Sequence, residues 1–272
     1  MKKILILIAF LIVAGSINAQ VVITPYVVLI DNQNKFGTYT VINQTNEEQE
    51  VSINFQFGYP VSDENGNVTM KYEDNPTPGM NALNEWLKIF PKRFLIKPGE
   101  KQTVRMTVDP PANLAAGTYW TRMVTSTQTK TIFSDTTRNL SAKVNFVLNQ
   151  ITTVIYKNKQ FNSNIVFNEL TVNQDTSSVN FVSDLSASGD QPFFAQFEYK
   201  VLDGSQNVVY ERNEFAGIYF NMKRKYEVPL TDLPPGNYTL IVRITSDDTQ
   251  DIPKSDNFPI APVEKTINFS VQ

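Results

Sequence analysis

Residues 93–108 read RFLIKPGEKQTVRMTV, two short runs on either side of a Pro-Gly pair. RFLI (93–96) and QTVRMTV (102–108) are rich in Val, Ile, Thr and Phe, the residue types that strands favour. In KPGE (97–100), proline presets φ and glycine permits positive φ, as a tight turn requires. The stretch therefore predicts two strands joined by a turn, the unit from which antiparallel sandwiches are built.

The same alternation of apolar runs and turn clusters continues in both directions, while helical periodicity is nearly absent after the first residues. Before residue 158 the runs are VVITPYVVLI (21–30), GTYTVI (37–42), EVSINFQF (50–57), TYWTRMVT (118–125) and AKVNFVLNQITTVIY (142–156). About seven further runs follow, in roughly 100 residues, the size of an immunoglobulin-like sandwich. We therefore predict an all-β protein of two immunoglobulin-like β-sandwiches in tandem, residues 20–157 and 158–272, with a polar joint at YKNKQFNSN (156–164).

One segment departs from this rhythm. MKYEDNPTPGMNALNEWLKIF (70–90) is long, carries two prolines and contains Trp86. It predicts a long Greek-key connection in which Trp86 plugs the core, with a helical turn at NALNEWL as the alternative.

The N-terminus, residues 1–19, has the features of a cleavable signal peptide. Lys2 and Lys3 give a basic start, an apolar run follows from Ile4 to Ala14, and the small-residue exit places cleavage after Ala19. No later apolar stretch approaches the ~20 residues of a membrane-spanning helix. The sequence thus predicts an exported protein without an integral membrane segment, periplasmic or, alternatively, secreted or associated with the cell surface.

Composition narrows the chemistry. The 272 residues include no His and no Cys, which excludes Ser-His-Asp and Cys-His nucleophiles and the zinc sites built on those ligands. A net charge of −3 without a basic stripe argues against a nucleic-acid partner, and KRK (223–225) is interpreted as a solvated strand face. No segment indicates a carboxylate pair in a cleft, so we expect no enzyme, no metal and no cofactor.

The stretch 142–156 has the clearest strand pattern. Its first half alternates apolar residues (Val144, Phe146 and Leu148) with polar ones, which places the apolar set on one face. Alternation alone leaves two interpretations open: these side chains line the core of their own domain, or they are presented to another protein.

The first half of the chain resembles the PapD-like periplasmic pilus chaperones. That family carries a P-x-x-x-x-L-x-P-G-x-x-Q-x-V-R pattern, and it is matched here by Pro91, Phe94, Pro98, Gly99, Gln102, Val104 and Arg105. YTVIN (39–43) matches an early L-x-V-x-N signature, with Tyr39 and Val41 inward and Asn43 closing the strand. LAAGTYWTRM stands where the family has an L-P-x-x-Y-R strand. The resemblance covers about residues 25–157 and implies an immunoglobulin-like scaffold.

The resemblance also implies a function. In that family the strand matching 142–156 completes the unfinished sandwich of a pilin by β-strand addition. Val144, Phe146 and Leu148 would then be the donor residues, preceded by a long polar loop (126–141). The expected partner is an extracytoplasmic subunit, pilin-like or another surface protein. A copy without a partner would have to cover the strand by self-capping or as a homodimer.

Two departures from the family stand out. Family members hold the subunit's terminal carboxylate with an Arg and a Lys, but Val27 and Thr153 occupy these positions here, and neither binds a carboxylate as a cation does. Lys157 keeps a basic position further along the strand and is a candidate contact. The second half lacks the family's second-domain signatures and looks like a generic adhesion-type sandwich.

Other candidate sites have a structural alternative. Tyr26, Tyr119 and Trp120 could form a sugar-binding platform, although core packing is expected for at least two of them. DENGN (63–67) and SDDTQD (246–251) hold oxygen ligands that suit Ca²⁺, but neither has full calcium-loop spacing, so exposed turns are expected. The alternative function is therefore a structural adhesion or cell-wall scaffold that binds glycan or a surface partner through its loops.

Overall fold

A computed structural model describes residues 20–77, 80–129, 146–159, 162–246, 252 and 259–272. Within these ranges the chain forms seventeen strands and one short 3₁₀ helix, Leu230–Asp232. The prediction of an all-β protein with two immunoglobulin-like sandwiches is confirmed. The predicted signal peptide (1–19) lies outside the described residues.

The first sandwich consists of two sheets. One has the order β1-β3-β8-β6, and the other β2-β10-β9-β4-β5 with β7 also paired to β4. The strands of the first sheet are β1 (Val21–Thr24), β3 (Phe36–Asn43), β8 (Lys101–Val108) and β6 (Leu87–Phe90). Those of the second sheet are β2 (Val27–Asp31), β10 (Val147–Asn158), β9 (Gly117–Thr129), β4 (Gln49–Ser62), β5 (Val68–Glu73) and β7 (Arg93–Ile96).

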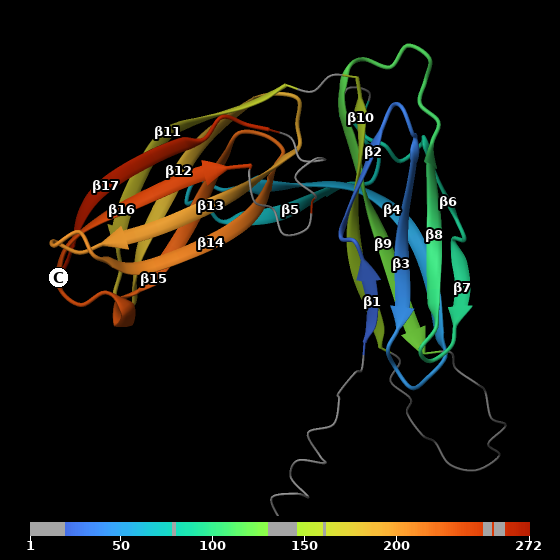
Figure 1. Ribbon diagram of the computed structural model, residues 1–272, viewed down its shortest axis with the longest axis horizontal. Coiled ribbons are helices and arrows are strands. Elements are labelled where there is room, and N and C mark those ends of the chain that lie inside the picture. The colour runs from blue at the N-terminus through green and yellow to red at the C-terminus, as the bar shows by residue number, and fades with distance from the viewer. Residues whose placement is uncertain (1–19, 78–79, 130–145, 160–161, 247–251, 253–258) are drawn as a thin grey trace, which may run out of the picture.

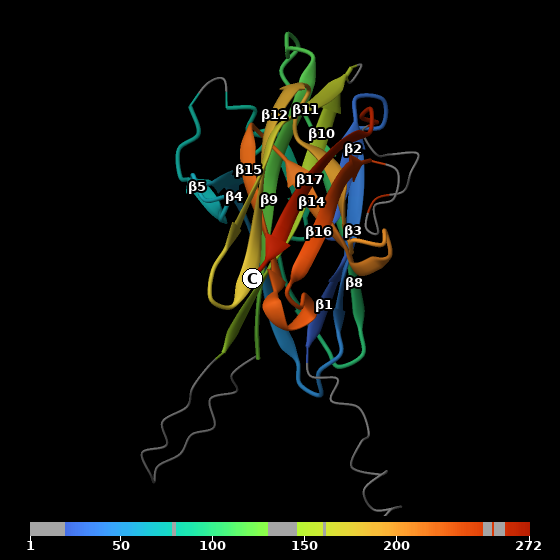
Figure 2. The ribbon, with the colours of Figure 1, turned by 90° about the vertical axis from the view of Figure 1, so that its left-hand side faces the viewer.

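The second sandwich has seven strands in the described ranges, as the sequence predicts. Its sheets have the orders β11-β12-β15 and β14-β13-β16-β17. The strands are β11 (Ser163–Gln174), β12 (Ser178–Gly189), β13 (Phe193–Leu202), β14 (Val208–Ile218), β15 (Met222–Pro229), β16 (Gly236–Thr245) and β17 (Val263–Val271). Figure 1 shows the two sandwiches next to each other, with the strands of the second running nearly crosswise to those of the first; Figure 2 gives the side view.

The core of the first sandwich is built from the alternate residues of these strands, as the pleat dictates. Tyr39 and Val41 of β3 point inward and are 1% and 0% exposed. The Tyr39 hydroxyl shares a hydrogen bond of 3.0 Å with Thr125 Oγ1, which satisfies it in the interior. Asn43 is the last residue of β3 and is buried. Its Nδ2 stabilises the following turn by donating to the carbonyl oxygens of Glu47 (2.8 Å) and Ile96 (3.0 Å).

The two sandwiches share packed side chains. Phe57, Trp120 and Ile155 come from the first sandwich but lie in the same apolar cluster as the core of the second. The Trp120 ring is 5.2 Å from that of Tyr219 in the second sandwich, and its Nε1 donates to the carbonyl oxygen of Gly58 at 3.1 Å. The junction is therefore a continuous apolar core and not a flexible linker alone.

The structure corrects several details of the sequence prediction. The run 21–30 is divided into β1 and β2, which belong to opposite sheets. The connection 70–90 contains the end of β5 and all of β6, and it has no helix where the structure describes it. Leu83, at 0% exposure, fills the core where Trp86 was expected, while Trp86 is only half-buried. The strand β5 was not predicted, although Val68, Met70 and Tyr72 alternate with polar residues; these three apolar side chains are exposed, so β5 has no buried face.

The KRK run (223–225) on β15 is only partly a solvated face. Arg224 turns inward, with Nη2 2.7 Å from Glu214 Oε2 and its guanidinium 5.1 Å from the centre of the Phe197 ring. The expectation of a solvated strand face is therefore wrong for Arg224, because alternate residues of a strand face opposite ways.

Candidate functional site

Strand β10 has two halves with different surroundings. From Thr153 to Lys157 it lies between β2, which is parallel to it, and β9, which is antiparallel. From Val147 to Thr152 it pairs with β9 alone among the described residues. The first half of β10 is thus a sheet edge, and the second half is an interior strand.

The path of the N-terminal strands creates this edge. β1 pairs with β3 in the opposite sheet, and the chain joins β10 only from Val27 onward. Within the described ranges, no strand occupies the position beside 147–152. A strand edge of this kind presents unpaired backbone groups and is a template for another strand.

The orientation of these backbone groups follows from one hydrogen bond. Thr153 N donates to the carbonyl oxygen of Tyr26 at 2.8 Å, so Thr153 directs its N–H toward β2. Successive residues of a strand alternate, and the β9–β10 ladder shows no register shift. Val147, Asn149 and Ile151 therefore direct their N–H and C=O groups to the unpaired side.

Apolar side chains surround this edge on both faces. Phe146 is 83% exposed, Val147 54%, Leu148 42% and Ile151 40%. Phe146 and Leu148 share their parity with Val154, which lies in the first core, whereas Val147 and Ile151 project to the opposite face.

The sandwich is open beside Phe146 and Leu148. A cavity of ≈570 Å³ lies there, and its lining includes Val21, Gln49 and Thr127. A partner's side chains could fill this cavity and pack against Phe146 and Leu148.

The predicted donor residues are thus placed as follows. Val144 lies outside the described residues, as does most of the predicted polar loop, although β9 extends into it as far as Thr129. Phe146 and Leu148 are not in their own core in the isolated chain, which contradicts the core interpretation for these two. Their role as donor residues remains a prediction.

Sequence reasoning missed Val147 and Ile151. Val147 interrupts the apolar–polar alternation, and this interruption was the available signal. Neighbouring residues of a strand project to opposite faces, so the consecutive apolar residues 146–148 place apolar side chains on both faces. The number of strands beside them could not be read from the sequence.

The two positions that the sequence resemblance assigns to a carboxylate anchor are neighbours in the structure. Val27 and Thr153 face each other in the β2–β10 ladder. The cation at this place is Arg122 of β9, opposite Thr153. Its Nη1 donates to Thr153 Oγ1, and its Nε donates to the Gly58 carbonyl oxygen at 3.2 Å.

Arg122 also joins the two sandwiches. Its guanidinium lies 5.0 Å from the centre of the Tyr219 ring, a cation–π geometry. Burial raises the pKa of Tyr219, so that side chain stays neutral beside the cation. Arg122 is thus held by β4, β10 and the second sandwich together.

Lys157 lies at the far end of β10 from the exposed half. It is in register with Asp31 of β2 and Thr118 of β9 and is partly buried. The structure does not bring Lys157 together with Phe146 or Leu148, because eight residues of extended strand lie between it and Leu148. Its predicted contact with a partner stays untested.

The remaining candidates behave mostly as structural residues. Tyr119 and Trp120 are 7% and 2% exposed, so core packing is confirmed for these two, while Tyr26 is 48% exposed. In DENGN (63–67), Asp63 Oδ1 accepts from the N–H groups of Asn65 and Asn67, so this carboxylate organises its own turn. Most of SDDTQD (246–251) lies outside the described residues.

The described part of the chain contains no group of three or more acidic side chains arranged to hold a metal ion. It also contains no helix that is long and apolar enough to span a membrane.

No protein-family model and no curated protein matches the chain. Similar solved structures include the chaperone–tip adhesion subunit complex of the archaic chaperone-usher Csu pili of Acinetobacter baumannii, at 14% identity and a TM-score of 0.48, covering 90% of this chain and 98% of that chain. The class 5 fimbriae chaperone CfaA has 13% identity and a TM-score of 0.44, with coverages of 91% and 98%. The complex of Salmonella enterica SafA pilin with the SafB chaperone has 9% identity and a TM-score of 0.42, with coverages of 93% and 99%. These structures contain pilus chaperones, the family that the sequence resembles.

Proposed function

We propose that this protein is an exported, non-catalytic chaperone-like protein that binds an extracytoplasmic subunit by β-strand addition at β10. The observation that carries the proposal is the unpaired edge 147–152, which has exposed apolar side chains on both faces. The sequence resemblance supports a pilin-like or other surface-protein subunit as the partner and the periplasm as the compartment.

The edge is of a size suited to this role. Six extended residues span roughly 20 Å, enough for a short strand. The outward backbone groups of Val147, Asn149 and Ile151 would supply hydrogen bonds independent of the partner's sequence, and side-chain burial would supply selectivity. Burying an exposed Phe or Leu side chain completely contributes about 1.5–3 kcal/mol before the entropy of association is subtracted.

Binding would rest on the strand and not on a charged anchor. Val27 and Thr153 provide no cation, and Arg122 already donates to Thr153 and Gly58. We therefore expect that a partner peptide with an amidated C-terminus binds about as tightly as the same peptide with a free carboxylate.

The test is co-purification of the tagged mature protein from its native envelope. Wild type is compared with Phe146→Asp/Leu148→Asp and with the matched control Phe90→Asp/Leu95→Asp, because Phe90 and Leu95 are also exposed, at 77% and 48%. We expect a stoichiometric partner with wild type and the control, lost in the β10 variant. Circular dichroism and melting establish that both variants fold. A partner retained by the β10 variant, or no partner with wild type, would refute the proposal.

A second variant tests the backbone contribution separately. Asn149→Pro removes an outward N–H and leaves the hydrogen bonds to β9 intact, because proline is tolerated on a strand edge. We expect loss of the partner with the fold retained. If Asn149→Pro still captures the partner at the wild-type level, strand addition at this edge is wrong, even if the apolar side chains matter.

One observation favours the scaffold alternative. A cavity of ≈600 Å³ beside the 80–86 segment is lined by two aromatic side chains, Trp86 and Tyr119, and by the amides of Asn81 and Asn84, a combination found in sugar sites. If the protein binds glycan there, a glycan array gives hits that Trp86→Ala abolishes. If the array gives no hits, strand addition is the only proposed function that remains.

A further inference from the structure

The hairpin formed by β4 and β5 reaches beyond the first sandwich. β9 pairs with β4 only as far as Gln56, whereas β5 pairs with Phe57–Ser62. Figure 1 shows these cyan strands extending to the second sandwich. Their connecting turn, residues 63–67, which we name the docking turn, lies against β15.

The docking turn and the adjacent Ser62 contact the edge of β15 by accepting hydrogen bonds from its backbone N–H groups. Lys225 N donates to the carbonyl oxygen of Gly66 at 2.9 Å, and Lys223 N donates to Ser62 Oγ at 2.8 Å. β15 is the outermost strand of its sheet, with β12 on its other side. Residues 223 and 225 are two apart and so direct both amides away from β12. The hairpin therefore caps two donors of an edge that would otherwise be open.

A second turn of the chain has the same internal construction. In the turn 203–207, Asp203 Oδ1 accepts from Asn207 N, and Asn207 Nδ2 donates to Asp203 Oδ2; Asp63 and Asn67 make the same pair of bonds. The fourth residue has positive φ in both turns: 82° at Gly66 and 67° at Gln206. Because glutamine holds this position in one turn, the turn itself does not demand glycine.

The contact with β15 is what demands glycine at 66. A Cβ on Gly66 would lie 2.6 Å from Lys225 N, 3.0 Å from the carbonyl carbon of Arg224 and 3.1 Å from Val182 Cγ1. Two of these atoms are backbone and cannot move aside as a flexible side chain would. The absence of a side chain at 66 thus allows the second sandwich to approach this closely.

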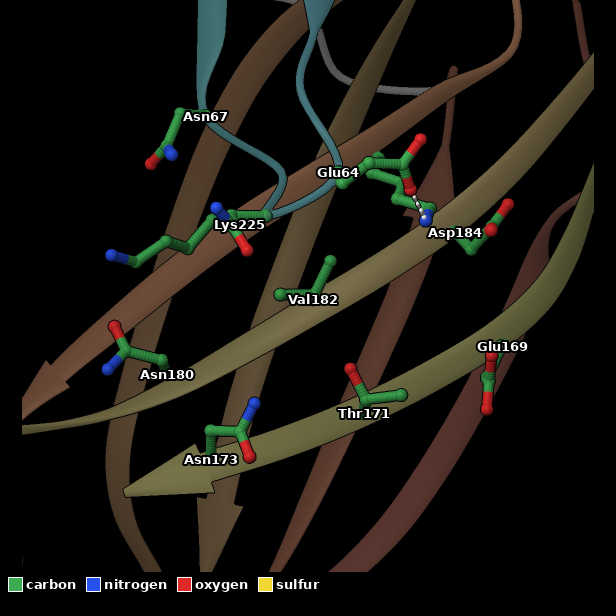
Figure 3. A pocket seen from close by; sticks show the side chains of 11 residues that line it. Glu64, Asn67, Glu169, Thr171, Asn173, Asn180, Val182, Asp184 and Lys225 are labelled. Carbon is green, nitrogen blue, oxygen red and sulfur yellow. Dashed lines mark hydrogen bonds and ion pairs between the residues drawn. The ribbon is translucent and has the colours of Figure 1, made fainter. Parts of the chain in front are cut away.

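The backbone hydrogen bonds that hold the turn are confined to the edge of β15. Beyond it, a cleft of ≈380 Å³ separates the turn from the sheet face, and Figure 3 shows Val182 on its floor with Thr171 and Asn180 beside it. Glu64 pairs with Lys223 across the cleft mouth, but the Glu64 side chain is 91% exposed, so water and salt screen that pair. The two backbone-directed hydrogen bonds and the close approach of Gly66 therefore hold the turn.

We infer that the docking turn is an intramolecular clamp: it closes the outer edge of β15 and fixes the second sandwich relative to β4. The bound segment is Ser62 together with the docking turn, and the recognised surface is the β15 edge around Lys223 and Lys225. This clamp is independent of any partner at β10. It also keeps the second sandwich from pairing through β15 with another chain.

The experiment exchanges the two turns' fourth residues in the mature protein. Gly66→Gln introduces the residue that the turn 203–207 carries at its fourth position, and Gln206→Gly is the matched control. Because the chain has no cysteine, spin labels at Lys101→Cys and Thr266→Cys report the distance between the sandwiches. Hydrogen exchange of the β15 amides reports the clamp directly.

We expect a narrow distance distribution for wild type and for Gln206→Gly. For Gly66→Gln we expect a broad distribution and exchange at Lys225 about tenfold faster or more, as loss of one protecting hydrogen bond implies. Unchanged exchange and an unchanged distribution in Gly66→Gln would overturn the inference. If that variant does not fold, Ser62→Ala removes one cap without a clash. Exchange must then accelerate at Lys223, and an unchanged rate there overturns the inference equally.

Discussion

Replacing Trp120 with alanine should separate the unfolding of the two sandwiches. The ring is 2% exposed and lies 5.2 Å from the rings of both Phe57 and Tyr219. Truncation of such a buried ring costs about 3–5 kcal/mol. The Gly58 carbonyl oxygen keeps Arg122 Nε as a donor at 3.2 Å, so no penalty for an orphaned acceptor is added. We expect about 4 kcal/mol of lost stability, all at the junction.

The assay uses the two tryptophans of the chain. In Trp120→Ala the remaining Trp86 lies in the first sandwich, so its fluorescence follows that unit, while far-ultraviolet circular dichroism follows both. Urea unfolding of wild type should give coincident transitions by the two probes, because a shared core makes unfolding cooperative. In Trp120→Ala the transitions should separate.

The matched control is Trp86→Ala, which removes the same side chain from a half-buried position against Tyr119, at a ring separation of 5.1 Å. We expect a cost of about 1–2 kcal/mol and transitions that stay coincident. Equal losses in the two variants, or coincident probes in Trp120→Ala, would show that the junction is not a shared core.

Three further predictions concern single side chains. Burial raises the pKa of Tyr39 to about 12. The stability that the neutral Tyr39 side chain contributes is therefore intact below pH 10 and is lost as pH rises through 12. Tyr39→Phe, which leaves Thr125 unpaired, should be about 1–2 kcal/mol less stable than wild type at pH 7; chemical denaturation should show this deficit shrinking at pH 11, and a constant deficit contradicts the assignment. Asn43→Ala removes the Nδ2 donor from the Glu47 and Ile96 carbonyl oxygens and the Oδ1 acceptor from Thr45 N, and it should cost about 2–4 kcal/mol in urea unfolding; a cost below 1 kcal/mol counts against the turn role. Leu148→Ala should cost about half of what Val154→Ala costs, or less, since Val154 is fully buried; calorimetry that ranks them in reverse places Leu148 in the core.

Much of the fold follows from local sequence patterns. KPGE (97–100) connects β7 and β8 as predicted, and Tyr39 and Val41 point inward. Period-2 alternation and turn chemistry depend on neighbouring residues only, so a sequence shows them. The division of 21–30 between two sheets depends on which distant strands each half meets, and nothing in its run of apolar residues specifies that.

The candidate site was predictable only in part. Alternation around Phe146 and Leu148 identified a strand, but whether that strand lies at an edge is decided by where β2 begins, more than a hundred residues away in the sequence. Gly66 illustrates the same limit. Its turn predicts positive φ, yet the reason for glycine is an atom of Lys225, which only the folded chain brings within reach.

Strand β10 also divides into a part that the fold constrains and a part that it does not. Thr152 to Tyr156 are buried, whereas Phe146 to Asn149 are exposed, and the change occurs within a single strand. Over evolution, substitutions before Thr152 are therefore free of the packing constraints that hold the rest of the strand. Under the proposed strand addition, partner choice can diverge while the scaffold does not. The same boundary marks a graft point: exchanging residues 146–151 between related proteins should transfer selectivity with the fold left unchanged.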